Sequence, residues 1–543
     1  MSPTTINPGK LTFDHLMTKG YFPDRVIPPV NSVGLSVALP DMLAYIRPIA
    51  KGMLKNPSKL RSRCVVHSVP KRKHLRRSLS IPNPLHQCMA ADQISTKWQA
   101  LHKFCLQSPL SLSVPILGVN RAITARVDLS RQPLFRAQRS VGARYLLKTD
   151  IARFYPSIYT HSIPWALHGK AAARADKKYL HFGNRIDLWT RESQDKQTGG
   201  IPIGPDTSFV IGEVIGTALD LELQKKLPNL QGTRSIDDYY LYFQSVSEAE
   251  TGLAVLHGIA KQYEIEINDP KTEIISLPDS FEPAWKSDLR SLAIRPTGQP
   301  QSTDLLSLFD RAYEHAKNYP SDSVLTYAAK RVLSADIVEG NWAFCESLLL
   351  RAALSEPTML SVLGDIYDRF APFHTDKDNQ ALTSTLESIC SYHAPLQQGN
   401  EVSWALWLAK KMSVTISKTV GDKIVGVDDD IVALVALDLI DLGYLRAAKP
   451  GLWRSFMTDS NLYDDHWLLA YEAHEHGWLP SKSDYDYVAA DQFFSILQGH
   501  GVRFYGDNLA PTSSYYGYAE VDSVADGNEE LMEDDDDTDV TSN

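Results

Sequence analysis

The sequence has few cysteines, and none of them stands in a metal-binding or redox pattern. Five cysteines occur in 543 residues, and neighbouring ones are at least 17 positions apart. This spacing excludes a CxxC pair of the kind found in zinc sites and redox motifs, and it favours free thiols in a reducing compartment. We therefore expect a cytoplasmic protein without structural disulfides.

Long apolar runs are also missing. The longest one, Ile431–Leu437, ends at Asp438, whereas a membrane span needs roughly 20 apolar residues. The first ten residues are polar, contain two prolines and lack the charged and apolar regions of a secretory signal. We expect neither secretion nor a membrane partner.

Hydrophobic residues, in contrast, are plentiful. They make up 43% of the chain, which is enough for sizeable cores, and a chain of this length commonly forms about three to four domains. The composition therefore predicts a globular protein of several domains.

Charge of one sign dominates each end of the chain. The formal net charge is -10, yet residues 520–543 hold eleven acidic side chains and no basic one. Residues 1–150 instead hold 23 Lys and Arg against 6 Asp and Glu, with the densest block at Lys71–Arg77. Such a density suits nucleic acid or a nucleotide as partner, and a solvated basic surface is the alternative.

Two segments predict neighbouring strands that carry acidic residues. Tyr145–Asp150 is a run of β-favouring residues that places Asp150 near a strand end. Ser235–Phe243 predicts a hairpin with Asp237 and Asp238 at its turn. Together they predict a sheet edge with three carboxylates.

A glycine- and proline-rich segment lies between these strands. Gly199–Pro205 cannot be regular structure, and Asp206 is placed to cap a helix that begins at about Thr207. The apolar residues that follow recur every three or four positions, which predicts one buried helix face.

After about residue 300 the sequence consists of amphipathic stretches separated by Pro, Gly, Asn or Asp. We expect an all-α domain, helical-repeat-like in the manner of an α-solenoid but without a strict repeat period. The candidate helices are Thr303–Lys317, Asp322–Leu333, Trp342–Ala353, Met359–Phe370, Ala381–Tyr392, Val402–Met412, Ile431–Leu442, Trp467–His476 and Tyr485–Gln498.

The three aspartates have the chemistry that nucleotidyl transfer requires. Two-metal catalysis needs carboxylates on neighbouring strands, close enough that bound divalent cations make their repulsion tolerable. Asp150 and the Asp237–Asp238 pair meet this need, although an isolated Asp-Asp hairpin is more often an ordinary turn. The order of the elements around them makes the signal specific.

That order resembles the palm of reverse transcriptases. Motif A corresponds to Thr149–Tyr155, the motif B loop to Gly200–Pro205 and the motif C hairpin to Ser235–Asp238. Ile267–Glu273 is similar to the motif D turn, and Arg77–Pro84 is similar to a fingers segment.

The sequence is most similar to the bacterial abortive-infection and defence-associated reverse transcriptases. Phe154–Lys170 and Gln197–Pro205 are nearly signature strings of this family, which also has a long helical domain in place of a thumb. One departure is Ser235, because the family usually has an aromatic residue two positions before the first Asp of motif C.

The resemblance implies an α+β right-hand polymerase palm and fingers followed by an all-α domain. Fingers and palm would occupy residues 1–300, with basic fingers at about 1–144 and the palm at about 145–300. The helical domain would span 301–518, and the acidic residues 519–543 would form a disordered tail.

The resemblance also assigns the metal ligands. Asp150 and Asp237 would ligate two Mg²⁺ ions, with Mn²⁺ as an alternative. The backbone carbonyl of Ile151 would help to bind them, and Asp238 would assist from the hairpin.

Nucleotide-binding roles follow in the same way, each with a plainer alternative. Tyr155 would be the steric gate below the sugar 2′ position, or else a packed core tyrosine. Arg77 would bind the triphosphate, or else be one more surface arginine. Lys271 would neutralise or protonate pyrophosphate, or else be merely exposed. The loop near the nascent base pair would contribute Gly200, Pro202, Ile203 and Gly204.

We therefore expect a cytoplasmic, bacterial antiphage-defence reverse transcriptase. Such an enzyme is an RNA-directed or template-independent DNA polymerase that transfers deoxynucleotides, with a protein primer or a non-coding RNA template among its options. Expected partners are dNTPs, an RNA template or non-coding RNA, the DNA product and further copies of the chain in a trimer or hexamer. The alternative is a catalytically vestigial polymerase-like scaffold whose helical domain binds a phage or host protein.

Overall fold

The computed structural model describes residues 9–53, 61–72, 75–373, 379–481 and 485–506. The acidic segment 519–543 lies outside the described residues. The fold is mixed α/β, with many helices and small sheets. Among the described residues, a helix with both the length and the apolar character of a membrane span is absent.

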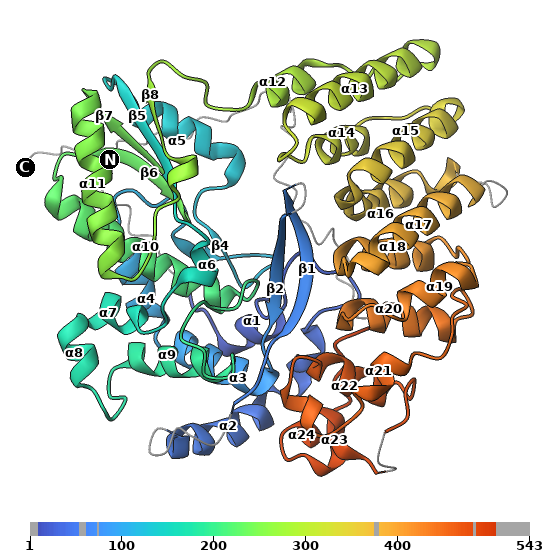
Figure 1. Cartoon of the computed structure of the whole chain (residues 1–543), viewed down its shortest axis with the longest axis horizontal. Helices are drawn as coiled ribbons and strands as arrows, with labels where there is room; N and C mark the ends of the chain where they lie inside the picture. The colour runs from blue at the N-terminus through green and yellow to red at the C-terminus, as the bar shows by residue number, and fades with distance from the viewer. Residues whose placement is uncertain (1–8, 54–60, 73–74, 374–378, 482–484, 507–543) are drawn as a thin grey trace, which may run out of the picture.

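A four-stranded antiparallel sheet lies at the left of Figure 1. Its strand order is β6-β7-β5-β8, with bounds β6 Gln231–Ser235, β7 Asp238–Phe243, β5 Tyr145–Asp150 and β8 Glu273–Ser276. The central pair β5 and β7 runs in the register Tyr145↔Phe243 to Asp150↔Asp238. The predicted strand and hairpin are thus neighbours in one sheet, which brings their acidic ends to the same edge.

Helix α11 (Val246–Gln262) packs on this sheet, and helix α10 (Asp206–Lys226) packs against α11 and is joined by ion pairs to Arg234 of β6. The sequence predicts one buried face for α10, but the helix is buried on most of its circumference because α3, α4, α7 and α11 pack around it. The predicted capping role of Asp206 is wrong. Asp206 is the first residue of α10, and its carboxylate instead accepts hydrogen bonds from Arg121 and from the Ile123 N–H at 3.0 Å.

The N-terminal third contributes a long hairpin and a group of helices. Strands β1 (Val65–Arg72) and β2 (Leu75–Ile81) pair in antiparallel register and stand near the centre of Figure 1. The helices of this third include α1 (Phe13–Thr18), α2 (Leu39–Met53), α3 (Pro84–Thr96) and α4 (Trp98–Cys105). Helix α3 begins where Pro84 supplies a helical φ and the Asn83 side chain accepts from the Leu85 N–H at 3.1 Å.

The second half of the chain is a curved arm of helices at the right of Figure 1. From residue 284 onward, every secondary-structure element that the structure describes is a helix. The arm comprises α12 (Ala284–Ser291), α13 (Gly298–Asn318), α14 (Val324–Leu333), α15 (Trp342–Ser355), α16 (Leu360–Arg369), α17 (Asn379–His393), α18 (Gly399–Lys411), α19 (Lys418–Ile424), α20 (Asp430–Asp441), α21 (Gly451–Ser455), α22 (Trp467–Glu475), α23 (Tyr487–Ala490) and α24 (Phe494–Gly499).

Two features of the arm differ from the sequence expectation. The single helix expected over Tyr485–Gln498 is two short helices, because Asp491 has an extended backbone. Its carboxylate accepts from the N–H groups of Phe493 and Phe494, both at 2.8 Å, and so starts α24. Helices α12, α19 and α21 were not expected, since each is too short to show a clear helical period.

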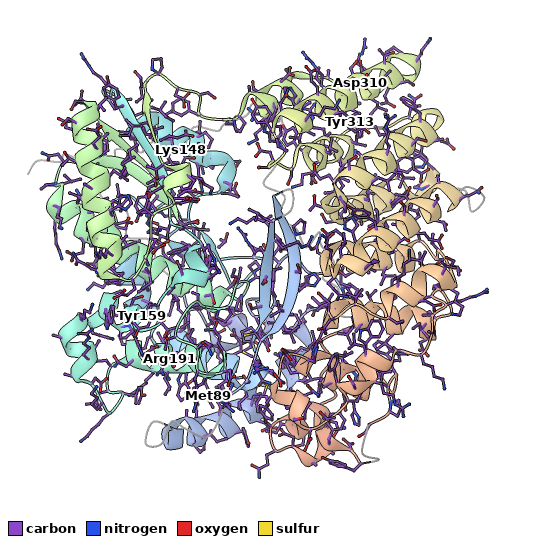
Figure 2. The ribbon with its side chains drawn as sticks, in the orientation of Figure 1. Met89, Lys148, Tyr159, Arg191, Asp310 and Tyr313 are labelled. Atoms are coloured by element: carbon purple, nitrogen blue, oxygen red, sulfur yellow. The ribbon has the colours of Figure 1, made fainter. Side chains whose placement is uncertain are left out.

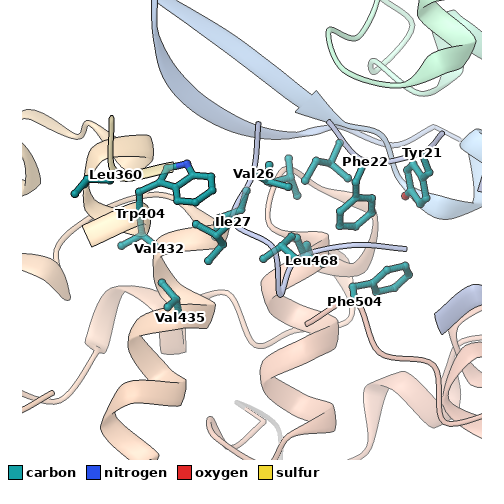
Figure 3. Packing of buried hydrophobic residues seen from close by; sticks show 14 of the residues in the cluster. Tyr21, Phe22, Val26, Ile27, Leu360, Trp404, Val432, Val435, Leu468 and Phe504 are labelled. Carbon is teal, nitrogen blue, oxygen red and sulfur yellow. The ribbon is translucent and has the colours of Figure 1, made fainter. Parts of the chain in front are cut away.

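The end of the arm packs back on the start of the chain. Val30 forms an antiparallel bridge with Tyr505, and the Trp467 indole donates to the Ile81 carbonyl at 3.1 Å. Figure 3 shows Val26 and Ile27 among apolar side chains of the arm, in one buried cluster. This cluster contains residues from both halves of the chain. The division into domains at about residue 300 stays a prediction.

Candidate active site

Three aspartates meet at the edge of the four-stranded sheet. Asp150 is the last residue of β5 and lies opposite Asp238, the first residue of β7. Asp237 and Ile236 form the two-residue turn between β6 and β7. The expectation that both motif C aspartates are in the turn is therefore wrong for Asp238, whose backbone pairs with Ser235 and Asp150 in the sheet.

The aspartates are in unequal electrostatic surroundings. Asp150 is buried, Asp237 is half-buried and Asp238 is exposed. Burial, together with the charges of Asp238 and Asp150, raises the pKa of Asp237 to about 6. Partial desolvation and the charge of Asp150 also raise the pKa of Asp238. The edge therefore disfavours three simultaneous negative charges unless a cation is present.

The protein supplies one cation itself. The Lys271 ammonium, from the short helix η3 (Asp269–Lys271), donates to Oδ2 of Asp150. The other oxygen, Oδ1, is buried and has no hydrogen-bond partner among the described residues. A buried carboxylate oxygen without a donor is suited to a metal ion.

The donor chemistry fits Mg²⁺, although the side chains are not arranged around a metal position. Across the ranges that the structure describes, no three His, Cys, Asp or Glu side chains form a group that could hold a metal ion. Hard carboxylate oxygens are nevertheless the ligands that Mg²⁺ prefers, and an unpaired buried oxygen on Asp150 is available. A cation at Oδ1 would lie on the same carboxylate as the Lys271 ammonium at Oδ2, and repulsion between the two positive charges would favour release of Lys271. The Ile151 N–H donates to the Asp237 carbonyl at 3.2 Å, and the role expected of the Ile151 carbonyl stays a prediction.

Arg77 on β2 lies within the electrostatic field of this edge. Burial and repulsion from Arg25 lower the pKa of the half-buried Arg77, while Asp237 and Tyr155 act in the opposite direction. The Arg77 backbone pairs with Val69 in the hairpin, but no hydrogen bond or ion pair joins the Arg77 side chain to another described residue. Its guanidinium therefore keeps its donors for an anionic ligand.

The neighbouring Arg76 points elsewhere, because successive side chains of a strand face opposite sides. Its guanidinium pairs with both oxygens of Glu401 on α18, at 2.5 and 2.7 Å, and also donates to the Ser68 carbonyl. One arginine of the pair thus holds the arm, and the other faces the aspartates.

Tyr155 lies between the aspartates and α10. Burial and the negative charge of Asp237 raise the pKa of its hydroxyl. A side chain at Gly212 on α10 would come within 3.3 Å of the Tyr155 ring, so this glycine makes room for it. Both alternatives for Tyr155 fit this position, since the ring is packed and also lies near Asp237.

The motif B loop is held close to these residues by its backbone. The Gly200 and Ile201 N–H groups donate to the carbonyls of Ile158 and Tyr155 at 2.9 and 3.0 Å. The Ile203 carbonyl accepts from the Ser80 N–H of β2 at 2.8 Å, and Pro202 is buried. Gly200 (φ 85°) and Gly204 (φ 137°) adopt backbone angles that favour glycine. The loop thereby joins β2 to the Tyr155 segment.

Three buried charged residues next to the β6–β7 hairpin were not predicted from the sequence. Arg234 on β6 is fully buried against Glu213 and Asp220, two acidic residues in the mostly apolar middle part of α10. Their spacing of seven residues, two helical turns on one face, was the available signal.

A cavity elsewhere in the structure does not contain the three aspartates. It has a volume of about 760 Å³ and is lined by residues that include Tyr159, Trp165, Asp187 and Arg191. Tyr159 and Arg191 lie at the lower left of Figure 2, well away from Lys148 on β5. The Asp187 carboxylate is already paired with His161 and Arg191.

Comparisons with known proteins add little. No protein-family model matches the sequence, and no curated protein matches it. Among solved structures, the apo telomerase of Candida tropicalis matches with 11% sequence identity and a TM-score of 0.31, covering 64% of this chain and 73% of that chain. A likeness of this size establishes neither fold nor function.

Proposed function

We propose that this chain is a nucleotidyltransferase of the reverse transcriptase type, with Asp150, Asp237 and Asp238 as its catalytic residues. The observation that carries the proposal is the register of β5 and β7, in which Asp150 lies opposite Asp238 and beside the turn with Asp237. The charge of Asp150 raises the pKa of both Asp237 and Asp238, and such a cluster of carboxylates at a sheet edge is typical of a site that holds divalent cations.

The reaction is transfer of a deoxynucleotide to a hydroxyl. The hydroxyl oxygen attacks the α-phosphorus of a dNTP and loses its proton, and the bond between this phosphorus and the bridging oxygen breaks to release pyrophosphate. Bound Mg²⁺, or Mn²⁺ in its place, supplies neutralisation of the phosphate charge and activation of the hydroxyl.

The residues of the chain bind and orient the nucleotide. Arg77 forms a bidentate pair with the triphosphate, because its donors are unused by the described residues. Tyr155 limits the space at the sugar 2′ position. The backbone of Gly200–Gly204 lies against the Tyr155 segment, where it lets the base pair approach closely.

Lys271 would supply a positive charge to the pyrophosphate. Its ammonium donates to Asp150, and it would turn to the pyrophosphate if a cation took its place beside that carboxylate. This is the role that the family resemblance implies for Lys271.

We propose that the protein acts in bacterial antiphage defence. It would synthesise DNA on an RNA template or a non-coding RNA, or from a hydroxyl of the protein itself. We further propose a trimer or hexamer, to be measured by light scattering of the full chain. The basic segment around Lys71–Arg77 supports a nucleic-acid partner.

The decisive experiment is dNTP incorporation by the purified full chain. The protein is isolated with its bound nucleic acid, that material is sequenced, and labelled dNTPs are added with Mg²⁺ with or without RNase. Label that migrates with protein until protease is added indicates a protein primer. Loss of incorporation after RNase indicates an RNA template.

Matched variants separate catalysis from a scaffold role. Asp150→Asn should lose incorporation, whereas Asp310→Asn, exposed on α13 in the arm, should keep it. A wild-type protein that incorporates no nucleotide with Mg²⁺ or Mn²⁺ would favour the vestigial scaffold instead.

A further inference from the structure

The buried Arg234 is surrounded by acceptors. Its Nε donates to Asp220 at 2.8 Å, and its two terminal nitrogens donate to the two oxygens of Glu213 at 2.7 and 3.1 Å. Hydroxyl groups satisfy the remaining carboxylate sites, namely those of Ser108, Ser111, Ser113 and Tyr239. The group is therefore a hydrogen-bonded ion network without exposure to solvent.

This network also reaches the turn of the aspartate hairpin. Arg234 Nη1 donates to the carbonyl of Ile236 at 2.9 Å. The N–H of Ile236 donates to Ser113 Oγ at 2.8 Å, and that hydroxyl donates to Glu213 at 2.8 Å. Both backbone polar groups of Ile236 are thus tied to one carboxylate, through Arg234 on one side and Ser113 on the other.

The turn needs such support because its backbone is unfavourable for the residue present. Ile236 has a φ of 55°, in the left-handed region that a β-branched side chain rarely adopts. Strained residues of this kind persist only where the surrounding structure holds them, and they gather at functional sites. The next residue is Asp237, whose carbonyl accepts from the Ile151 N–H at 3.2 Å.

Helix α10 leaves room for the guanidinium. A Cβ at Gly216 would lie 2.5 Å from Arg234 Nη1. Glu213 is on the same helix, so α10 supplies both the acidic partner and the gap into which the guanidinium fits.

We propose that Arg234, Glu213 and Ser113 are positioning residues that hold the strained Ile236–Asp237 turn and so aim the Asp237 carboxylate toward Asp150. The inference rests on the proposed function for the identity of the reaction, but the hydrogen bonds to the turn are independent of it. A buried ion network contributes little net stability compared with apolar packing, whereas outer groups that orient a metal ligand commonly have a large effect on metal binding.

The network offers a matched pair of gentle substitutions. Ser113 and Ser111 both donate to Glu213, but only Ser113 also accepts from the Ile236 N–H. Ser113→Ala therefore loses one contact with the carboxylate and one with the turn. Ser111→Ala loses one contact with the carboxylate and the acceptor of the Ser113 N–H at 3.1 Å, but no direct contact with the turn. Arg234→Lys is a harsher variant, because it leaves two buried acids incompletely paired.

Binding of Mn²⁺, followed by electron paramagnetic resonance without nucleotide, is the first measurement. We expect Ser113→Ala to weaken Mn²⁺ binding by about 10-fold and Ser111→Ala to stay within about 2-fold of wild type. The Mg²⁺ concentration for half-maximal dNTP incorporation should move in parallel, and thermal unfolding of both variants should be similar. Equal metal affinities for the two variants, or an unchanged affinity in Ser113→Ala, would overturn the proposal.

A second substitution tests the strain itself. Glycine adopts a positive φ without a steric cost. Ile236→Gly, introduced together with Ser113→Ala, should therefore restore most of the metal affinity that Ser113→Ala alone loses. A double variant no better than Ser113→Ala would contradict the role of a strained turn. If wild type binds Mn²⁺ in this way but incorporates no nucleotide, the proposed function fails while the positioning role stands.

Discussion

The ammonium of Lys271 donates to Oδ2 of Asp150, across 121 positions of sequence. This contact places a positive charge on the most buried of the three aspartates while leaving its Oδ1 without a partner. A divalent cation at Oδ1 would therefore compete with the Lys271 ammonium for the negative charge of the same carboxylate.

Removing Lys271 should strengthen metal binding in the absence of nucleotide. A half-buried ion pair of this kind contributes up to about 1 kcal/mol, so Lys271→Met should lower the Kd for Mn²⁺ by roughly 3- to 5-fold. Turnover should nevertheless fall, because the neutral side chain no longer pairs with pyrophosphate. Lys226→Met, exposed at the end of α10, is the control, and unchanged Mn²⁺ affinity in Lys271→Met would refute the competition.

Asparagine in place of either Asp150 or Asp237 should abolish catalysis without loss of the fold. Asp150→Asn and Asp237→Asn each remove one charged ligand, and we expect dNTP incorporation to fall by at least about 1000-fold. Circular dichroism and size-exclusion chromatography check folding and assembly. Full polymerisation by either variant would rule out the site assignment.

The metal-free protein should be more stable when Asp237 is neutral. Burial, then the charges of Asp238 and Asp150, raises the pKa of this carboxyl from 3.8 to about 6. Stability linked to its proton is fully present below pH 3.8 and is lost as pH rises through about 6.

At pH 7 with EDTA, Asp237→Asn should therefore raise the free energy of unfolding by roughly 1 kcal/mol. This is less than the whole pKa shift of Asp237 would give, because solvent screens a side chain that is only half-buried. The measurement is denaturant unfolding at pH 7 and pH 4.5, and the gain should shrink at the lower pH. Addition of Mg²⁺ should stabilise wild type more than the variant. A variant less stable than wild type at pH 7 would show that the aspartate charge is compensated locally.

Reducing the volume of Tyr155 should relax sugar selection. Tyr155→Val opens space next to Gly212 and the Asp237 turn, so the ratio of dNTP to rNTP incorporation should fall by about 10-fold or more. Tyr155→Phe keeps the ring and should keep the ratio. An unchanged preference in Tyr155→Val would identify the residue as core.

Arg77 and Arg76 should have separable effects, because they face opposite sides of β2. Loss of a charged hydrogen bond to the triphosphate in Arg77→Gln should raise the KM for dNTP by about 10- to 100-fold with little change in stability. Arg76→Gln leaves Glu401 buried without its partner and should cost about 1 to 3 kcal/mol of stability. Steady-state kinetics and thermal unfolding of both variants check the expectation, and a normal KM in Arg77→Gln would contradict it.

Local chemistry in the sequence determined the elements of the candidate site. The β-favouring run ending at Asp150, the Gly199–Pro205 loop and the Asp-Asp hairpin were predicted, because strand period and turn residues depend on near neighbours. Most helices of the arm were predicted for the same reason. The break at Asp491 was not, since one aspartate within an amphipathic stretch is an ordinary surface residue by sequence alone.

The tertiary structure decided which charges meet. Nothing local distinguishes Arg76 from Arg77, or indicates that Lys271 contacts Asp150, because each pairing joins residues that are far apart in the chain. Burial of Arg234 with Glu213 and Asp220 likewise depends on how β6 packs against α10. The sequence determined which residue types the candidate site contains. Packing between distant segments determined which of these charges are paired in the interior and which stay unpaired near the sheet edge, because the electrostatic cost of each charge depends on its buried partners.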